Sequence, residues 1–156
     1  MRFGVSILLC IVLCSVSLGG QSRITSNPFQ EIIRKTSIKK GDIVVIAFLI
    51  PGECVKCNLT LSSAFIWIKE KMVKRKAKFV GFISCHRQIE LKQHAPHFPM
   101  FDLLLMDDGD IRQQMGIAST ARAVVCDHSG KVLGVVSYEE YFGDIQAAFK
   151  RILKIK

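Results

Sequence analysis

The sequence contains no internal repeat and no low-complexity tract, and its 156 residues are enough for one domain. It also has no apolar run of the ~20 residues that a membrane-spanning helix needs. The longest such run, Val5 to Leu18, is shorter and lies at the N-terminus. Repeat architectures and bundles of membrane helices are therefore excluded, and a single domain is expected.

The short N-terminal run has the features of a secretory signal. Met1-Arg2 supplies a positive start, and Ser17 to Gly20 supplies small residues for cleavage after Gly19 or Gly20. We therefore expect a signal peptide over residues 1–20 and an exported protein, periplasmic or secreted. An uncleaved N-terminal membrane anchor is the alternative. Residues 21–40 are predicted to be a polar N-terminal leader, and residues 41–156 the domain.

Cysteines are sparse. Of the six in the chain, Cys10 and Cys14 fall inside the N-terminal run, which leaves Cys54, Cys57, Cys85 and Cys126. An exported chain can keep disulfides, but a structural disulfide framework uses cysteine more densely. Because only Cys54 and Cys57 are close in sequence, a single active pair fits better than a framework.

Acidic residues are also few, with 13 Asp and Glu against 22 Lys and Arg, for a net charge of +9. The densest basic stretch runs from Lys69 to Lys78. We interpret it as a solvated helix end whose cations complement the helix dipole. Binding to anionic lipid headgroups or acidic partners is the alternative. No nucleic-acid partner is expected, because no aromatic residues are interleaved with the cations.

The most informative motif that is present is Cys54-Val55-Lys56-Cys57. It follows the apolar run 43–50 and the turn Pro51-Gly52, and it precedes a segment with helical spacing. Two thiols at this spacing can close a small disulfide ring, and a helix start favours the thiolate that attacks a disulfide. A strand, a turn, C-x-x-C and a helix in this order therefore indicate dithiol redox chemistry.

The pattern along the chain predicts alternating strands and helices. Apolar residues Leu61, Phe65, Ile68 and Met72 step by three and four, which gives a helix a buried stripe. The predicted order is β-α-β-α-β-β-α, in a mixed central sheet ordered 79–84, 43–50, 121–126, 132–136 with helices on both faces. Helices are expected near 29–35, over 58–75, near 87–93 and over 138–154, with one or two helical turns over 111–115. Residues 101–106 form a short extended piece.

This order, with C-x-x-C after the first strand, resembles the thioredoxin superfamily. Three stretches resemble its redoxin branch, which includes thiol-specific antioxidant proteins and exported thiol–disulfide oxidoreductases: residues 104–111, residues 115–117, and residues 124–132 with their Asp-x-x-Gly-Lys turn. The resemblance covers nearly all of residues 41–153. It implies a thioredoxin-like fold in which Cys54 is the nucleophile and Cys57 the resolving thiol, with no cofactor.

The sequence departs from the family at several positions near this pair. Glu53 stands where an aromatic residue usually precedes the first cysteine, and Val55-Lys56 replaces the common Gly-Pro. The family's cis-proline loop, which presents backbone to substrate, falls at Thr120-Ala121 without a proline. A non-proline cis bond costs ~2.5–4 kcal/mol, so this bond is expected to be trans. Lys56 favours the Cys54 thiolate and Glu53 opposes it.

One further departure lies in the first strand, where Phe48 fills the place of the buried carboxylate that some thioredoxins use as a proton acceptor. Peroxidase relatives carry Pro-x-x-x-Thr/Ser-x-x-Cys. Counted from Pro51, the hydroxyl position is Val55 and the cysteine position is Asn58, so the pattern fails. Peroxidase activity is therefore not expected.

The remaining candidates are a metal site and the two other thiols. His94 and His97, with Cys54 and Cys57, have the soft ligands of a copper site, although copper-handling relatives place three residues between their cysteines. No metal site is predicted. Cys85 is interpreted as a small, partly buried residue, with an extra thiol or metal ligand beside the pair as the alternative. Cys126 is expected to be packed in a strand.

The sequence thus predicts an exported, monomeric thiol–disulfide oxidoreductase that acts on protein thiols and disulfides. By the resemblance, it works as a reductase supplied by a membrane electron donor. Two rivals remain. One is a redox-inactive thioredoxin-like binding domain, and the other is a copper-binding chaperone.

Overall fold

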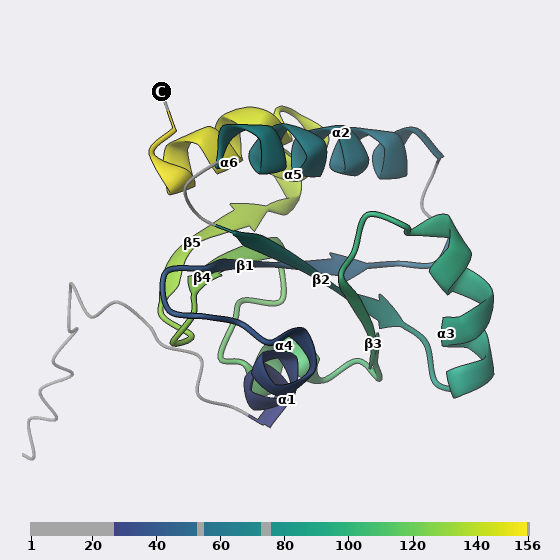
Figure 1. The fold of residues 1–156 in the computed structure, drawn as a ribbon. Helices are drawn as coiled ribbons and strands as arrows, with labels where there is room; N and C mark the ends of the chain where they lie inside the picture. Colours follow the sequence, from purple (N-terminus) through teal and green to yellow (C-terminus); the bar gives the residue numbers. More distant parts are fainter. Residues whose placement is uncertain (1–26, 53–54, 73–75, 156) are drawn as a thin grey trace, which may run out of the picture.

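The computed structural model describes residues 27–52, 55–72 and 76–155, with the backbone alone at Asn27 and residues 55–58. Five strands and the helices around them follow one another along the chain (Figure 1). In order, the elements are α1 (Asn27–Thr36), β1 (Ile43–Leu49), α2 (Val55–Lys71), β2 (Ala77–Ser84), α3 (Gln88–His94), the 3-10 helix η1 (Ala95–His97), β3 (Leu103–Asp107), α4 (Ile111–Gln114), β4 (Ala121–Asp127), β5 (Val132–Ser137), α5 (Tyr138–Phe142) and α6 (Ile145–Leu153).

The strands form one mixed sheet in the order β3-β2-β1-β4-β5. Strands β1, β2 and β3 are parallel, whereas β4 is antiparallel to both β1 and β5. The predicted order of the four main strands is therefore confirmed. Strand β1 is central and all seven of its residues are buried, as its continuous apolar run indicated.

The structure adds a fifth strand to the predicted order. Residues 101–106 were expected to form only a short extended piece, but β3 pairs with β2 along its whole length. The side chain of Asp102 fixes the start of this pairing, because its carboxylate accepts a hydrogen bond from the Phe79 N–H at 2.8 Å. The Asp102 N–H in turn donates to the Phe79 carbonyl at 2.8 Å.

The predicted single helix over 138–154 is wrong, because the chain breaks it into α5 and α6. Ser137 starts α5 with a capping box that involves Glu140. The backbone then leaves helical geometry at Gly143, and the Asp144 side chain accepts a hydrogen bond from Ala147 N–H at 2.9 Å to start α6. Two capped starts in close succession therefore override the continuous helical spacing.

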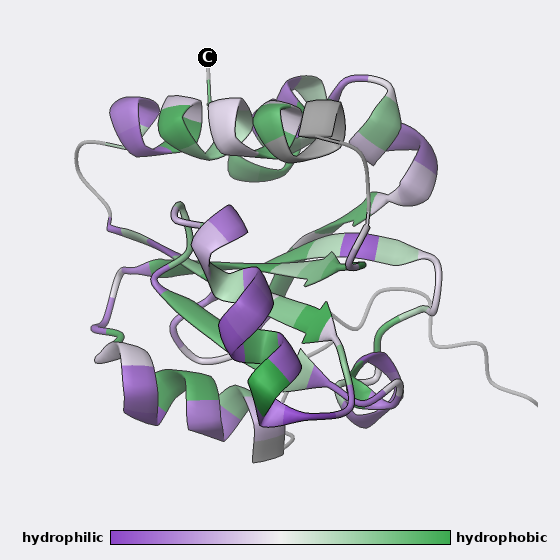
Figure 2. Cartoon of the chain, turned by 90° about the vertical axis from the view of Figure 1, so that its right-hand side faces the viewer, coloured by the Kyte–Doolittle hydropathy of each residue, from purple (hydrophilic) through white to green (hydrophobic). Residues whose placement is uncertain are grey.

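Helices cover both faces of the sheet, so the domain has two cores (Figures 1 and 2). One core lies between the sheet and α2, α5 and α6. The other lies between the sheet and α1, with Met115 and Ile111 from the α4 region. Residues of β1 alternate between the two, so that Val45 faces the first and Phe48 faces the second. The predicted stripe of α2 is confirmed at Leu61, Phe65 and Ile68, which are all buried.

An aromatic cluster fills the first core. The Phe65 ring from α2 lies 4.3 Å from the Phe79 ring, 5.2 Å from the Phe101 ring and 6.1 Å from the Phe149 ring, centroid to centroid. These residues belong to separate parts of the chain. Phe65 therefore ties α2 to β2, to the segment before β3 and to α6.

Helix α1 is packed against the sheet. Residues 27–36 come from the stretch that the sequence suggested as a polar leader, yet Phe29 and Ile32 are fully buried in the second core. Their burial makes α1 a cover for one face of the sheet. Among the described residues, no helix is both long and apolar enough to cross a membrane.

Cys126 in β4 is fully buried in the second core, as expected for a packed residue. Burial, with a smaller contribution from Asp127, raises the pKa of its thiol from 9.0 to about 12. The folded state thus favours the neutral thiol. This contribution to stability is complete below pH 9 and is lost as the pH rises toward 12, by about 1.4 kcal/mol per unit.

Cys126→Ala should therefore flatten the alkaline loss of stability. Urea unfolding at pH 8 and pH 10 is expected to show a fall in the free energy of unfolding that is about 1.4 kcal/mol larger for the wild type than for the variant. Equal falls in the two proteins would show that Cys126 does not ionise on unfolding in this range.

Candidate active site

The candidate residues lie where the parallel strands end, at the end of the sheet that is called the candidate active-site edge below. In the parallel register Leu49 pairs with Ile83, and Ser84 pairs with Asp107, so β1, β2 and β3 all finish at this edge. Strand β4 is antiparallel to β1 and begins there, at Ala121. The turn after β1, Cys85 after β2 and the Thr120-Ala121 loop before β4 therefore lie along the same edge.

The C-x-x-C motif lies between β1 and α2. Cys54 and Glu53 fall outside the described residues. Val55, Lys56 and Cys57 form the first turn of α2, so this helix begins earlier than the predicted Asn58. Gly52 makes the turn with a φ of +87°, a conformation that side chains rarely adopt. The strand, the turn and the helix are thus present around the motif, while the distance between its thiols and their exposure stay predictions.

The Thr120–Ala121 peptide bond is trans, since no cis bond occurs among the described residues. The loop is held instead by hydrogen bonds to the main chain of Ala121. Its N–H donates to the Ala118 carbonyl at 3.0 Å, and its carbonyl accepts from Arg112 Nε at 3.1 Å. The role of Thr120 and Ala121 in substrate binding stays a prediction.

Two arginines near this edge, Arg112 and Arg122, were not predicted from the sequence as site residues. Arg122, beside Ala121 in β4, is only 4% exposed. Its guanidinium carbon lies 5.2–5.7 Å from the ring centroids of Tyr138, Tyr141 and Phe142. An arginine inside a predicted buried strand was a signal for such an aromatic cage.

Apolar side chains are exposed near the same edge. Ile50 follows β1, while Tyr138 and Phe142 belong to α5, which follows β5 at its pairing with Ala121. The centroids of the Tyr138 and Phe142 rings lie 4.6 Å apart, and both side chains are exposed to solvent. Three exposed apolar side chains therefore lie near this edge.

Cys85 lies at the end of β2 and is 4% exposed. Its N–H donates to the Asp107 carbonyl at 3.1 Å. Burial, followed by the charges of Glu90 and Asp107, raises the pKa of its thiol. Cys85 is therefore a buried, protonated thiol, close to the interpretation as a small packed residue, and an unfavourable attacking group.

The histidines do not form a metal site with other described residues. His94 ends α3 and His97 ends η1. Within residues 27–52, 55–72 and 76–155, no group of three or more His, Cys, Asp or Glu residues could hold a metal ion. Because Cys54 lies outside this part of the chain, a copper site with the pair stays an untested alternative.

The basic stretch lies at the opposite edge of the sheet. Helix α2 ends at Lys71, and β2 begins at Ala77 beside Ile43, the first residue of β1. Lys69 is exposed, with its Nζ 4.9 Å from the centre of the Phe79 ring. The described part of this stretch is thus remote from the candidate dithiol and fits the interpretation as a solvated helix end.

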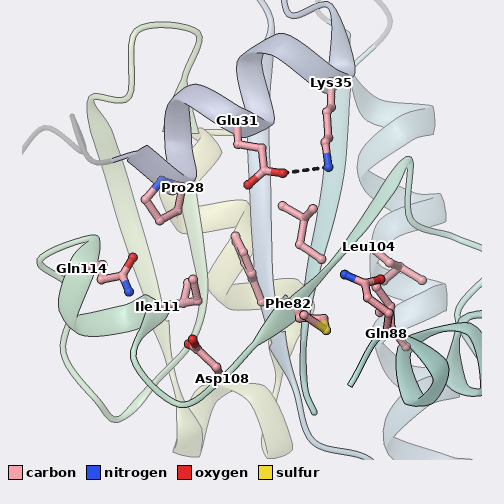
Figure 3. A pocket seen from close by; sticks show the side chains of 12 residues that line it. Pro28, Glu31, Lys35, Phe82, Gln88, Leu104, Asp108, Ile111 and Gln114 are labelled. Atoms are coloured by element: carbon pink, nitrogen blue, oxygen red, sulfur yellow. Dashed lines mark ion pairs between the residues drawn. The ribbon is translucent and has the colours of Figure 1, made fainter. Parts of the chain in front are cut away.

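A groove of about 440 Å³ follows the outer edge of β3 (Figure 3). Residues from both faces of β3 line it, together with Gln88 of α3 and Ile111 of α4. Helix α1 contributes Glu31 and Lys35, which form an ion pair at 2.7 Å. No cysteine is among its described lining residues.

Comparison with known proteins identifies the fold. No protein-family model and no curated protein matches the sequence. Solved structures do match. An uncharacterised thioredoxin-like protein from Porphyromonas gingivalis has a TM-score of 0.55 at 16% identity, over 74% of this chain and 76% of that one. A thioredoxin-like protein from Aeropyrum pernix has a TM-score of 0.53 at 15% identity, over 76% and 80%.

A third structure, a thiol:disulfide interchange protein from Bacteroides sp., has a TM-score of 0.51 at 16% identity, over 73% and 74% of the two chains. The three resemble this chain in the arrangement of the sheet and helices. Assignment to the redoxin branch stays a prediction from the sequence motifs. The architecture itself is plain, and the chain has the thioredoxin-like fold.

Proposed function

We propose that this protein is an exported thiol–disulfide oxidoreductase that acts on protein disulfides through Cys54 and Cys57. The observation that supports this most is the position of the motif between a buried strand and a helix N-terminus. The backbone of Cys57 lies in the first turn of α2, so the motif lies at a helix N-terminus, which favours thiolates. Lys56 in the same turn adds a positive charge.

The reaction consists of two exchanges. The Cys54 thiolate attacks one sulfur of a substrate disulfide, a mixed disulfide forms, and the other substrate sulfur leaves as a thiolate. The Cys57 thiolate then attacks Cys54 sulfur, which releases the second substrate thiol and leaves a Cys54–Cys57 disulfide. Two electrons pass to the substrate. A dithiol donor, membrane-bound by the family resemblance, must reduce the pair again.

The substrate is proposed to be an exposed protein disulfide flanked by extended chain. Ile50, Tyr138 and Phe142 offer apolar contact, and the loop before β4 lies at the same edge. The trans bond and the missing proline in this loop favour one rival, a binding domain with little redox activity. The copper chaperone is the other rival, and Cu(I) binding by the reduced protein tests it.

A trapping experiment tests the proposal. Cys57→Ser removes the resolving thiol, so Cys54 should stay joined to its substrate in a mixed disulfide. Incubation of the reduced variant with insulin should give a disulfide-linked adduct. The adduct is visible by non-reducing electrophoresis and is broken when dithiothreitol reduces the disulfide. Cys54→Ser/Cys57→Ser is the matched control and should give no adduct. An adduct of equal yield in the control would assign the chemistry to another thiol and refute the proposed roles.

A further inference from the structure

The loop before β4 lacks the proline that would fix it, and a side chain from a distant element holds it instead. Arg112 comes from α4, and its Nε donates to the Ala121 carbonyl at 3.1 Å. The Ala121 N–H is satisfied locally by the Ala118 carbonyl at 3.0 Å. Both the N–H and the carbonyl of Ala121 therefore form hydrogen bonds, and the donor to the carbonyl is a charged guanidinium. Hydrogen bonds to charged groups are the stronger kind.

Arg112 is itself held in place on two other sides. Its Nη1 lies 3.8 Å from Asp107 Oδ2, and its guanidinium carbon lies 4.4 Å from the centre of the Phe48 ring. The Asp107 side chain is only 4% exposed and the Arg112 side chain 23% exposed. A planar guanidinium can stack on a ring and donate from two nitrogens at once, whereas an ammonium cannot.

The position of the Asp107 side chain is fixed by the tight turn that leads into α4. Its Oδ1 accepts a hydrogen bond from the Gly109 N–H at 2.9 Å, and Gly109 has a φ of +104° that allows this turn. The chain of contacts therefore runs from the end of β3 through Arg112 to the start of β4. These are two of the strand ends that form the candidate active-site edge.

We propose that Arg112 is a positioning residue that holds the Ser119–Ala121 loop in the orientation in which it meets a substrate peptide. This role rests on the proposed function. A proline would restrict this loop from within its own backbone, whereas Arg112 restricts it from outside through a hydrogen bond to the Ala121 carbonyl. The dithiol chemistry itself does not need Arg112, but the docking of a polypeptide does.

The test compares two disulfide substrates in Arg112→Met and Arg112→Lys. For insulin, Arg112→Met is expected to lower kcat/KM about tenfold, mainly through a higher KM, and Arg112→Lys should recover part of the loss. For a small aromatic disulfide that needs no backbone docking, the rate should stay within about twofold of wild type. Arg87→Lys is the control, because Arg87 forms an exposed ion pair with Glu90.

A second readout follows the loop directly. Amide hydrogen exchange of residues 118–122 should become faster in Arg112→Met, while exchange in the centre of β1 stays unchanged. Because Arg112→Met leaves Asp107 without its ion pair, Asp107→Asn/Arg112→Met serves as a second variant if the first fails to fold. Equal losses for both substrates, or an unchanged KM for insulin, would overturn the positioning role.

The two proposals can fail separately. A wild-type protein that reduces neither disulfide would refute the proposed oxidoreductase function. Exchange at residues 118–122 would then decide alone whether Arg112 fixes this loop, and unchanged exchange in Arg112→Met would refute that as well.

Discussion

Replacing Phe65 with alanine is expected to lower the free energy of unfolding by about 3–5 kcal/mol. The Phe65 ring is 1% exposed and packs against Phe79, Phe101 and Phe149, which belong to different segments. Removing it loses the transfer free energy of the ring and leaves a cavity that these other rings cannot close without moving. Urea unfolding followed by circular dichroism measures the change.

Ile66→Ala is the matched control for this prediction. Ile66 is the next residue of the same helix, but its side chain is 57% exposed. Its substitution should change the free energy of unfolding by no more than about 0.5 kcal/mol. Alanine raises the helix propensity at either position. Similar losses in both variants would therefore contradict the claim that burial in the aromatic cluster sets the stability contributed by Phe65.

Cys54→Ser should abolish catalysis, so that insulin is reduced only at the background rate of dithiothreitol. A serine hydroxyl is a far weaker nucleophile than a thiolate at neutral pH, and no mixed disulfide can form on it. Insulin precipitation, followed by turbidity, measures the rate. Cys85→Ala should keep the wild-type rate, because Cys85 is buried and the pKa of its thiol is raised. The opposite result would move the nucleophile to Cys85.

The sequence predicted the elements that depend on local pattern. The run 43–50 predicted a strand buried on both faces, and β1 lies at the centre of the sheet with all of its residues buried. The stripe of Leu61, Phe65 and Ile68 predicted the buried face of α2. Strand β3 was less visible because it is short and because its register depends on Asp102, which contacts Phe79 far away in sequence.

The candidate site was only partly predictable for the same physical reason. The motif around Cys57 is a local pattern of strand, turn and helix, so its placement could be read from neighbouring residues. The roles of Arg112 and Arg122 depend on tertiary contacts, with Ala121 and Phe48 for one and with the rings of α5 for the other. Nothing in the spacing of the sequence joins α4 to the start of β4.

The burial of Phe29 and Ile32 also limits the length of the segment that connects the domain to the N-terminal apolar run. Because α1 belongs to the core, the chain from Asn27 onward must stay with the domain. Were the apolar run that ends at Leu18 kept in a membrane, residues 19–27 could span at most about 30 Å, even fully extended. The domain of the anchored protein would then stay within this distance of the membrane and would meet only partners that lie close to the bilayer. The domain of the cleaved protein would diffuse freely.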